Sequence, residues 1–338
     1  MTTFLVPGTA GVPSQEVTTA PERPVATPAI DLLEGRRTLC RLRGDGPDRS
    51  STEGETGPDE DPRGADYTAF ALTPFGTTLG AEIAGVDLGE PLDAELRAEL
   101  HRALLEWKVL VFRDQDLSSA AQREFARHWG ELETNPLLEQ GEDPRVVRFT
   151  KGGDGPQTYE NIWHADTTFR AAPAMGAVLR MVRTPPFGGD TMWADMAAAY
   201  DNLTDEVKDR IEGATATHDM VPGFVRFLDP ERLARLQDTF PPVHHPVVRT
   251  HPETGRRTLF VNASFTTAID GMDPAESDFL LRHLYAQAHV PEYQVRVRWA
   301  PGSVVFWDNR ATQHYAVGDY HPHPRVAERV AIAGGRPL

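Results

Sequence analysis

The stretch Trp163-His164-Ala165-Asp166-Thr167-Thr168-Phe169 decides the fold and the chemistry that we expect of this 338-residue chain. Its useful part is His164 and Asp166, which are separated by one residue. On an extended strand, residues two apart project to the same face. This imidazole and this carboxylate can therefore bind one metal ion from adjacent positions, although a third ligand must come from elsewhere. On its own, the pair is also compatible with a buried, hydrogen-bonded histidine at a polar strand end.

A second polar run supplies the candidate for the third ligand. It is Phe306-Trp307-Asp308-Asn309-Arg310-Ala311-Thr312-Gln313-His314-Tyr315, and the candidate is His314. Two histidines and one carboxylate on one face of iron(II) leave the other face open for an oxidisable co-substrate and O2. The chain's other internal histidines have no ligand spacing to this triad, so we expect structural or surface roles for His218, His244, His245 and His251.

Two arginines follow His314, at positions 325 and 329. They lie in Pro324-Arg325-Val326-Ala327-Glu328-Arg329-Val330-Ala331-Ile332, which alternates in polarity and is rich in β-branched residues, so we expect a strand. Arg325 and Arg329 would then face the same side. Guanidinium groups suit planar carboxylates, which they hold by paired hydrogen bonds. The C-terminal end therefore offers cationic contacts for an organic acid, or alternatively two surface salt bridges.

With these segments in order, the chain resembles the TauD/TfdA family of iron(II)- and 2-oxoglutarate-dependent dioxygenases, and the resemblance covers roughly residues 67 to 338. The matching segments are Trp163 to Phe169, Gly188-Gly189-Asp190-Thr191-Met192-Trp193, Trp307 to Ala316, Asp319-Tyr320 and the two arginines. Weaker similarity begins near Tyr67 and includes Gly80-Ala81-Glu82-Ile83 and Val111-Phe112-Arg113-Asp114-Gln115.

The resemblance implies a metal site and a reaction. Iron(II) would be bound by His164, Asp166 and His314, which would also be the catalytic residues. The family couples the oxidative decarboxylation of 2-oxoglutarate by O2, which gives succinate and CO2, to hydroxylation of a C–H bond. Asp166 favours hydroxylation over halogenation, because halogenases of this type lack the carboxylate and bind chloride in its place.

The resemblance also implies a co-substrate site. Arg325 and Thr191 would bind the distal carboxylate of 2-oxoglutarate. Arg329, one strand repeat further on, would lie near the co-substrate and the anionic group of the substrate.

The substrate is less clearly indicated. Taurine dioxygenase has a histidine in the segment that matches Gly130 to Pro136, where this chain has Asn135, or Glu133 if the alignment shifts by two. Neither residue offers an imidazolium to a sulfonate, and a glutamate would repel an anion. With Phe169 as a candidate pocket wall and Arg329 as an anion anchor, we expect a small anionic or zwitterionic substrate other than taurine. The classes left open are sulfonates, sulfate esters, carboxylates such as amino acids, and phosphate esters.

Two functions of other classes stay open at this point. A zinc hydrolase could use the same three ligands to activate a water molecule. It would leave Thr191, Arg325 and Arg329 without a role. A non-catalytic protein that binds 2-oxoglutarate or another small acid on a jelly-roll scaffold is also possible, because fold does not fix function.

The amino-acid composition changes once along the chain, near residue 66. Residues 1–66 are rich in Pro, Gly, Thr and acidic residues, so we expect a mostly disordered arm, whose role as a docking segment or as an unselected extension is open. The net charge of −16 argues against binding to nucleic acid. A single cysteine, Cys40, the absence of a signal-like start and the lack of a long apolar run favour a cytoplasmic protein with no membrane contact. We also expect a homo-oligomer, either a dimer or a tetramer.

From residue 67 to residue 338 the pattern predicts one domain, mainly β with flanking helices. We expect helices at about 93–107, 118–129, 194–201, 204–212, 230–237 and 275–289. Between them lie many short strands with turn signals, which indicate a double-stranded β-helix (jelly-roll, cupin-like) core. Residues 133–160 lose periodicity, so we expect an irregular segment there, either a lid over the site or an ordinary loop.

Overall fold

The computed structural model describes residues 67–134, 143–153 and 160–338. The expected arm of residues 1–66 lies outside the described residues, and so does Asn135, one of the candidate substrate residues. In the part of the chain that is described, no helix has the length and apolar character needed to cross a membrane.

The largest sheet has seven strands in the order β1-β2-β3-β13-β5-β15-β4. All its neighbouring pairs are antiparallel except β2 and β3, which are parallel. Its strands are β1 (Ala71–Pro74), β2 (Ala81–Ala84), β3 (Val109–Phe112), β13 (Val304–Asp308), β5 (Gly176–Arg183), β15 (Arg325–Ile332) and β4 (Val146–Lys151).

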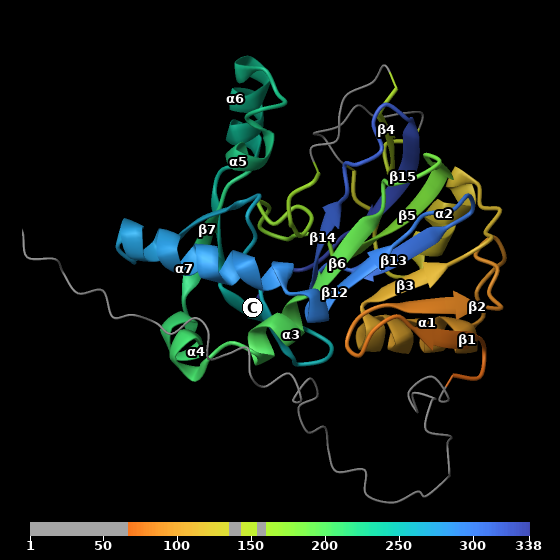
Figure 1. Cartoon of the computed structure of the whole chain (residues 1–338), viewed down its shortest axis with the longest axis horizontal. Coiled ribbons are helices and arrows are strands. Elements are labelled where there is room, and N and C mark those ends of the chain that lie inside the picture. Colours follow the sequence, from red (N-terminus) through yellow and green to blue (C-terminus); the bar gives the residue numbers. More distant parts are fainter. Residues whose placement is uncertain (1–66, 135–142, 154–159) are drawn as a thin grey trace, which may run out of the picture. The chain divides into compact units, whose positions relative to one another are not determined.

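A three-stranded antiparallel sheet, in the order β12-β6-β14, packs against one face of the large sheet (Figure 1). Its strands are β12 (Gln294–Val297), β6 (Thr191–Asp195) and β14 (Thr312–Ala316). The space between the sheets is filled by one apolar cluster that includes Trp307 and Met181 from the large sheet and Trp193 and Val295 from the small one. The strands of the large sheet place every second residue in this space, as the period of a strand requires.

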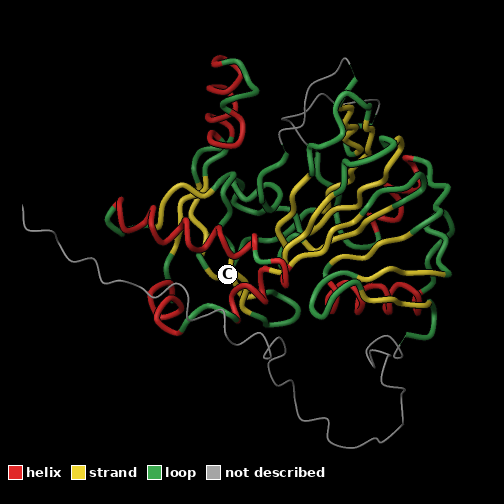
Figure 2. Tube along the Cα trace, viewed as in Figure 1, coloured by secondary structure: helices red, strands yellow, loops and turns green. Residues whose placement is uncertain are grey.

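The opposite face of the large sheet is covered by α1 (Ala94–Trp107) and α2 (Ser119–Arg127). Both helices start where the sequence predicted, because the side chain of Asp93 accepts a hydrogen bond from the Leu96 N–H and that of Ser118 accepts one from the Ala121 N–H. The fold is therefore a three-layer arrangement of helices, a large sheet and a small sheet. In Figure 2 the strands are yellow and the helices that flank them are red.

The remaining described elements lie between β6 and β12 in the sequence. Two small antiparallel sheets, β11-β7-β8 and β10-β9, are found there. The helices are α3 (Met196–Asp201), α4 (Asp205–Ile211), α5 (Val221–Phe224), α6 (Pro230–Thr239) and α7 (Pro274–Ala286). The strands are β7 (Thr215–His218), β8 (Val243–Pro246), β9 (Val248–Thr250), β10 (Arg257–Leu259) and β11 (Thr266–Ile269), and two 3-10 turns, Gln287–His289 and Pro291–Tyr293, precede β12.

Two local expectations were wrong. The segment 133–160 is not irregular throughout, because β4 lies within it and forms the edge of the large sheet. The stretch around His164 is not a regular strand either. Only His164 forms a β-bridge, and the chain turns from Asp166 onward. The main prediction, a mainly β protein with flanking helices, is confirmed.

Candidate active site

The three predicted metal ligands converge. The ligand atoms of His164, Asp166 and His314 all lie within 4.8 Å of one another. Nε2 of each histidine is 4.0 Å from Oδ1 of Asp166, and the two imidazole rings have centroids 4.1 Å apart. Two neutral nitrogen donors and one carboxylate that face a common point fit the three-residue facial site of non-haem iron(II).

A backbone bridge fixes the two histidines relative to each other. The His314 N–H donates to the His164 carbonyl at 2.7 Å, and the His164 N–H donates to the His314 carbonyl at 3.1 Å. The Nδ1–H of His164 also donates to the carbonyl of Ile162 at 2.7 Å. That bond leaves Nε2 of His164 as the free lone pair, which is the state that a metal ligand needs.

His314 lies on β14 and is buried. Burial, with a further contribution from the neighbouring His164, lowers the pKa of His314 to about 3. The imidazole is therefore neutral at physiological pH, as metal binding requires.

The side chain of Asn309 holds the backbone of Asp166 in place. The side-chain amide of Asn309 donates to the Asp166 carbonyl at 3.0 Å, and its oxygen accepts from the Asp166 N–H at 2.8 Å. The same amide donates to the carbonyl of Ala174 at 3.0 Å. The next residue, Thr167, has φ 58°, a left-handed conformation that is rare for a β-branched side chain. Such strain persists where the surroundings impose it, and it often marks a functional site.

Arg329 lies beside the carboxylate of Asp166. Its Nη1 is 2.8 Å and 2.9 Å from the two carboxylate oxygens, and its guanidinium lies over the ring of Phe149. Burial opposes ionisation of Asp166, but the charge and hydrogen bonds of Arg329 favour it, and the pKa of that carboxyl lies below its usual value. Asp166 is therefore anionic at neutral pH, as a carboxylate ligand to a metal must be.

Arg325 and Thr191 meet between the two sheets, as expected. Arg325 is 7% exposed, and its Nη2 is 3.3 Å from the hydroxyl oxygen of Thr191. Its Nε donates to the carbonyl of Gly189 at 3.0 Å, and the indole of Trp299 donates to the same threonine oxygen. Among the described residues Arg325 forms no direct ion pair with a carboxylate, although Glu160 and Asp190 lie close enough to favour its charged form. Burial nevertheless lowers the pKa of its guanidinium.

Glu133 lies near the metal ligands but is not an isolated negative charge. Arg170 donates to its carboxylate at 3.1 Å, and both side chains are mostly buried. Burial raises the pKa of Glu133 and Arg170 opposes that shift, with Asp166 and Arg329 acting as further charged neighbours. The sequence-based concern that this glutamate would repel an anion therefore neglects the positive charge that accompanies it.

Phe169 belongs to an aromatic cluster next to the ligands. It packs edge-on against Phe265, Phe224 and Phe240, with ring centroids 5.1 to 6.0 Å apart. Phe265 in turn lies 6.4 Å from the ring of His164. This cluster joins α5 and α6 to the ligand stretch.

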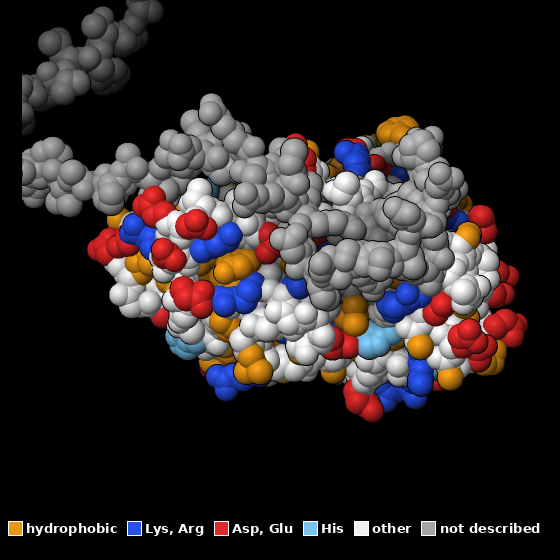
Figure 3. All heavy atoms as spheres, turned by 90° about the horizontal axis from the view of Figure 1, so that it is seen from below, with side chains coloured by type: hydrophobic (Ala, Val, Ile, Leu, Met, Phe, Trp, Pro, Cys, Tyr) orange, Lys and Arg blue, Asp and Glu red, His pale blue; other side chains and the backbone are white. Residues whose placement is uncertain are grey.

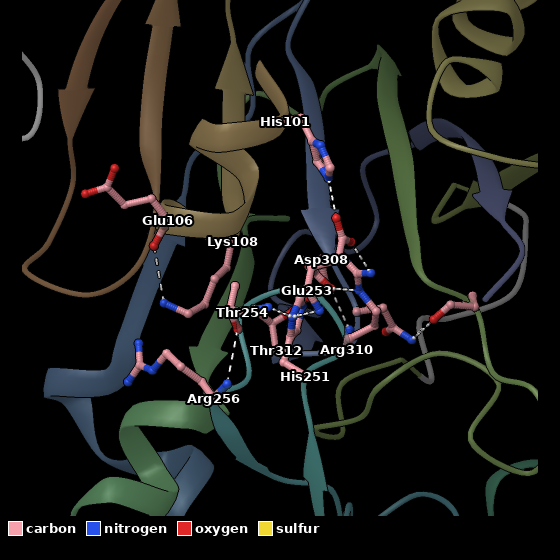
Figure 4. A network of polar contacts seen from close by, with 12 residues as sticks. His101, Glu106, Lys108, His251, Glu253, Thr254, Arg256, Asp308, Arg310 and Thr312 are labelled. Carbon is pink, nitrogen blue, oxygen red and sulfur yellow. Dashed lines mark hydrogen bonds and ion pairs between the residues drawn. The ribbon is translucent and has the colours of Figure 1, made fainter. Parts of the chain in front are cut away.

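A polar network with a buried centre at Asp308 lies at the turn that precedes His314 (Figure 4). Asp308 accepts hydrogen bonds from His251 and Arg310, and Glu253 links Arg310 to His101. His251 thus has a structural role, as the sequence indicated. Sequence reasoning missed Asn309 and Arg170, although Asn309 lies within a quoted run and Arg170 directly follows one, because their partners are set by the tertiary fold.

The chain is similar to proteins of known type over most of its length. The family model described as Taurine catabolism dioxygenase TauD, TfdA family matches residues 71–331. The chain is 38% identical over 277 residues to the alpha-ketoglutarate-dependent sulfate ester dioxygenase of Pseudomonas putida, and the match covers 78% of this chain and 90% of that protein. It is 36% identical over 264 residues to an alkylsulfatase of Acinetobacter baylyi, with 76% and 82% covered.

The fold agrees with a solved structure. A taurine dioxygenase from Burkholderia xenovorans has a TM-score of 0.70 and 34% sequence identity, and the match covers 80% of this chain and 91% of that one. Together with the facing sheets, this likeness confirms the predicted jelly-roll core.

Proposed function

This chain belongs to the TauD, TfdA family and is an alpha-ketoglutarate-dependent dioxygenase, and we propose that it hydroxylates a C–H bond of a small organic anion. Alpha-ketoglutarate, or 2-oxoglutarate, is decarboxylated to succinate and CO2. One atom of O2 enters succinate and the other enters the substrate. Membership of this family favours a dioxygenase over the two alternatives left open by the sequence, a zinc hydrolase and a non-catalytic binding protein.

One observation supports the roles of the residues best: a three-ligand site lies beside a buried arginine that makes no direct ion pair with a described carboxylate. A buried guanidinium whose direct hydrogen-bond partners are neutral is suited to an anionic ligand. We assign Arg325 and Thr191 to the distal carboxylate of 2-oxoglutarate. A bidentate guanidinium and a hydroxyl together match the geometry of a carboxylate.

The metal ligands are His164, Asp166 and His314. When bound, iron(II) supplies a redox-active centre with free positions for the co-substrate and O2. The protein's own contribution is to keep the imidazole of His314 neutral, to hold Asp166 anionic through Arg329, and to fix the ligand stretch through Asn309.

The substrate side combines positive charge with apolar surface. Arg329 contacts the carboxylate of Asp166, Arg170 contacts that of Glu133, and Phe265 lies beside His164. We propose that the anionic group of the substrate binds near Arg329 and that an apolar body packs toward Phe265 and Phe169. The relatives named for sulfate esters and alkyl sulfates support this class. Taurine, which has an ammonium group in place of an apolar body, fits it less well.

Succinate formation tests the activity. We expect 2-oxoglutarate turnover that needs iron(II) and O2, and we expect it to be lost in His164→Ala and greatly weakened in Arg325→Met. Hydrolysis of a substrate without O2 or 2-oxoglutarate would refute the proposal in favour of a zinc hydrolase. Tight binding of 2-oxoglutarate without succinate, in the presence of the whole substrate panel, would refute it in favour of a binding protein.

A substrate panel tests the anion anchor. It includes an alkyl sulfate, an alkyl sulfonate, a phenoxyalkanoate, an amino acid, a phosphate monoester and taurine, each with a matched uncharged alcohol. We expect the best turnover with an anion that has an apolar body, and we expect Arg329→Met to raise its KM. Faster turnover of the uncharged compounds would overturn the anchor.

Three broader expectations belong to the proposal. The even mixture of acidic and basic side chains on the face in Figure 3 and the net charge of −16 support the absence of nucleic-acid binding. The single cysteine supports a cytoplasmic location. Light scattering of the purified chain would test the proposed dimer or tetramer.

A further inference from the structure

The turn that follows Asp166 has a strained conformation at its second residue. The N–H of Arg170 donates to the carbonyl of Thr167 at 2.9 Å and so closes the turn. Thr167, directly after the ligand, has the left-handed φ of 58°. A β-branched residue keeps this conformation only where its surroundings impose it. Asn309 supplies one restraint, on the side of Asp166, and the contacts on the other side of Thr167 decide whether the turn is held at both ends.

One imidazole holds the other end of the turn. Nε2 of His245 lies 2.9 Å from the carbonyl oxygen of Thr168 and 2.9 Å from that of Arg170. Both partners are acceptors, so Nε2 carries the hydrogen and donates to the two carbonyls at once. Burial lowers the pKa of His245, which favours the neutral ring with that single hydrogen. Asn262 adds a contact to the hydroxyl of Thr168 at 3.0 Å, whereas His245 holds the backbone of the turn.

The ring of His245 is itself fixed by packing. His245 lies on β8 and is 1% exposed. Its ring packs edge-on against those of His218 and Phe260, with centroids 5.0 and 5.7 Å apart. The neighbouring His244 projects to the opposite face of the strand, where it contacts Asp270 and its side chain is 63% exposed. Because a buried, packed ring keeps its orientation, its one donor can hold the turn in a single position.

We propose that His245 is a positioning residue for the metal site. Together with Asn309 it holds the turn at both ends, and it thereby keeps the carboxylate of Asp166 directed toward the two histidine ligands. The inference rests on the proposed metal ligands, and His245 acts on them through the backbone of the turn. Loss of its N–H leaves two buried carbonyls without this donor. Thr167 can then relax toward an ordinary conformation and carry Asp166 out of place.

The test measures iron(II) affinity and stability in the same variants. Anaerobic titration of the metal-free protein with iron(II), in the presence of 2-oxoglutarate, gives the Kd of the metal, and thermal unfolding is followed in parallel. His245→Phe keeps a buried ring but has no donor. We expect it to raise the Kd for iron(II) about tenfold, the lower end of the range for a residue that orients a metal ligand, because its effect passes through the backbone. His244→Phe, the same substitution at the exposed neighbour, is the control and should leave the Kd unchanged.

Two amide side chains test the donor itself. In His245→Gln the amide nitrogen can reach close to the position of Nε2, whereas in His245→Asn the amide is one carbon shorter and falls short of the carbonyls. We expect the Kd for iron(II) to stay within about threefold of the wild type in His245→Gln and to rise about tenfold in His245→Asn. Equal Kd values in these two variants would overturn the inference, and the comparison is informative even if His245→Phe does not fold.

A double variant tests whether His245 and Asn309 act on the same turn. In His245→Phe combined with Asn309→Ala, the loss of iron(II) affinity should be smaller than the product of the two single losses, because either substitution already releases Thr167. A loss equal to that product would count against a shared turn.

The outcomes separate this inference from the proposed function. If the wild-type protein does not bind iron(II), the proposed metal site itself fails. If the wild type binds iron(II) and His245→Phe binds it equally tightly, only the role of His245 fails. A lower unfolding temperature of His245→Phe with an unchanged Kd would leave His245 a purely structural role and would also refute the inference.

Discussion

Removing the side-chain amide of Asn309 should loosen the metal site without removing a ligand. Asn309 makes three hydrogen bonds of 2.8 to 3.0 Å, two to the backbone of Asp166 and one to Ala174. They hold the segment in which Thr167 has its left-handed conformation. In Asn309→Ala this segment can relax, and Asp166 then leaves the position in which it faces both histidines.

The size of the effect follows from the number of bonds. Each buried hydrogen bond contributes about 0.5–1.5 kcal/mol, so the three together contribute about 1.5–4.5 kcal/mol. Part of this energy stabilises the fold and part of it orients the ligand. Loss of a residue that orients a metal ligand typically weakens metal binding by about 10- to 100-fold. That range corresponds to about 1.4–2.7 kcal/mol, which the three bonds can supply.

The assay is anaerobic titration of the metal-free protein with iron(II) in the presence of 2-oxoglutarate, with thermal unfolding measured in parallel. We expect Asn309→Ala to bind iron(II) about 10- to 100-fold more weakly than the wild type. Asn202→Ala is the control, because Asn202 donates one hydrogen bond to its own helix outside the site. Iron(II) affinity equal to that of the wild type in Asn309→Ala would refute the reasoning.

Three further predictions concern stability. Burial lowers the pKa of His218 from 6.5 to about 3, so below pH 6.5 the unfolded chain binds a proton that the folded chain does not, and stability falls as the pH falls toward 3. In His218→Gln the slope of unfolding free energy against pH between 6 and 4 should be smaller by about 1.4 kcal/mol per pH unit, and an unchanged slope would contradict this. Gly176→Ala places a Cβ against a backbone carbonyl of β13 and should cost about 1–3 kcal/mol in urea unfolding, whereas Gly335→Ala, with open space around it, should be nearly neutral. Arg170→Met leaves Glu133 buried without its ion pair and should cost about 3 kcal/mol; adding Glu133→Gln should recover most of that loss, and no recovery would argue against the pair.

Local signals predicted part of this fold well. The helices expected at about 93–107 and 118–129 begin where the sequence indicated, since a capping side chain, here that of Asp93 or Ser118, acts on N–H groups within its own turn. The alternating pattern of residues 325–332 predicted both the strand and the shared face of Arg325 and Arg329, because strand periodicity is a local property. The spacing of His164 and Asp166, together with the family resemblance of the segments around them and around His314, predicted these three residues as the metal ligands.

Features that depend on pairing between distant segments were not predictable in this way. β4 has a weak pattern of its own and is a strand because β15 pairs with it. The turn after Asp166 is imposed by Asn309, a residue 143 positions away. The pairs Arg170 with Glu133 and Lys151 with Glu160 depend on the register of the sheets, which the sequence does not specify for short strands of mixed polarity.

The most direct measurement of the central claim is an anomalous-scattering map at the iron edge, from anaerobic crystals grown with iron(II) and 2-oxoglutarate. We predict a single strong peak within bonding distance of His164, Asp166 and His314, and co-substrate density that ends at the guanidinium of Arg325. A peak that lacks any one of the three ligands, or a co-substrate whose distal carboxylate points away from Arg325, would contradict the account.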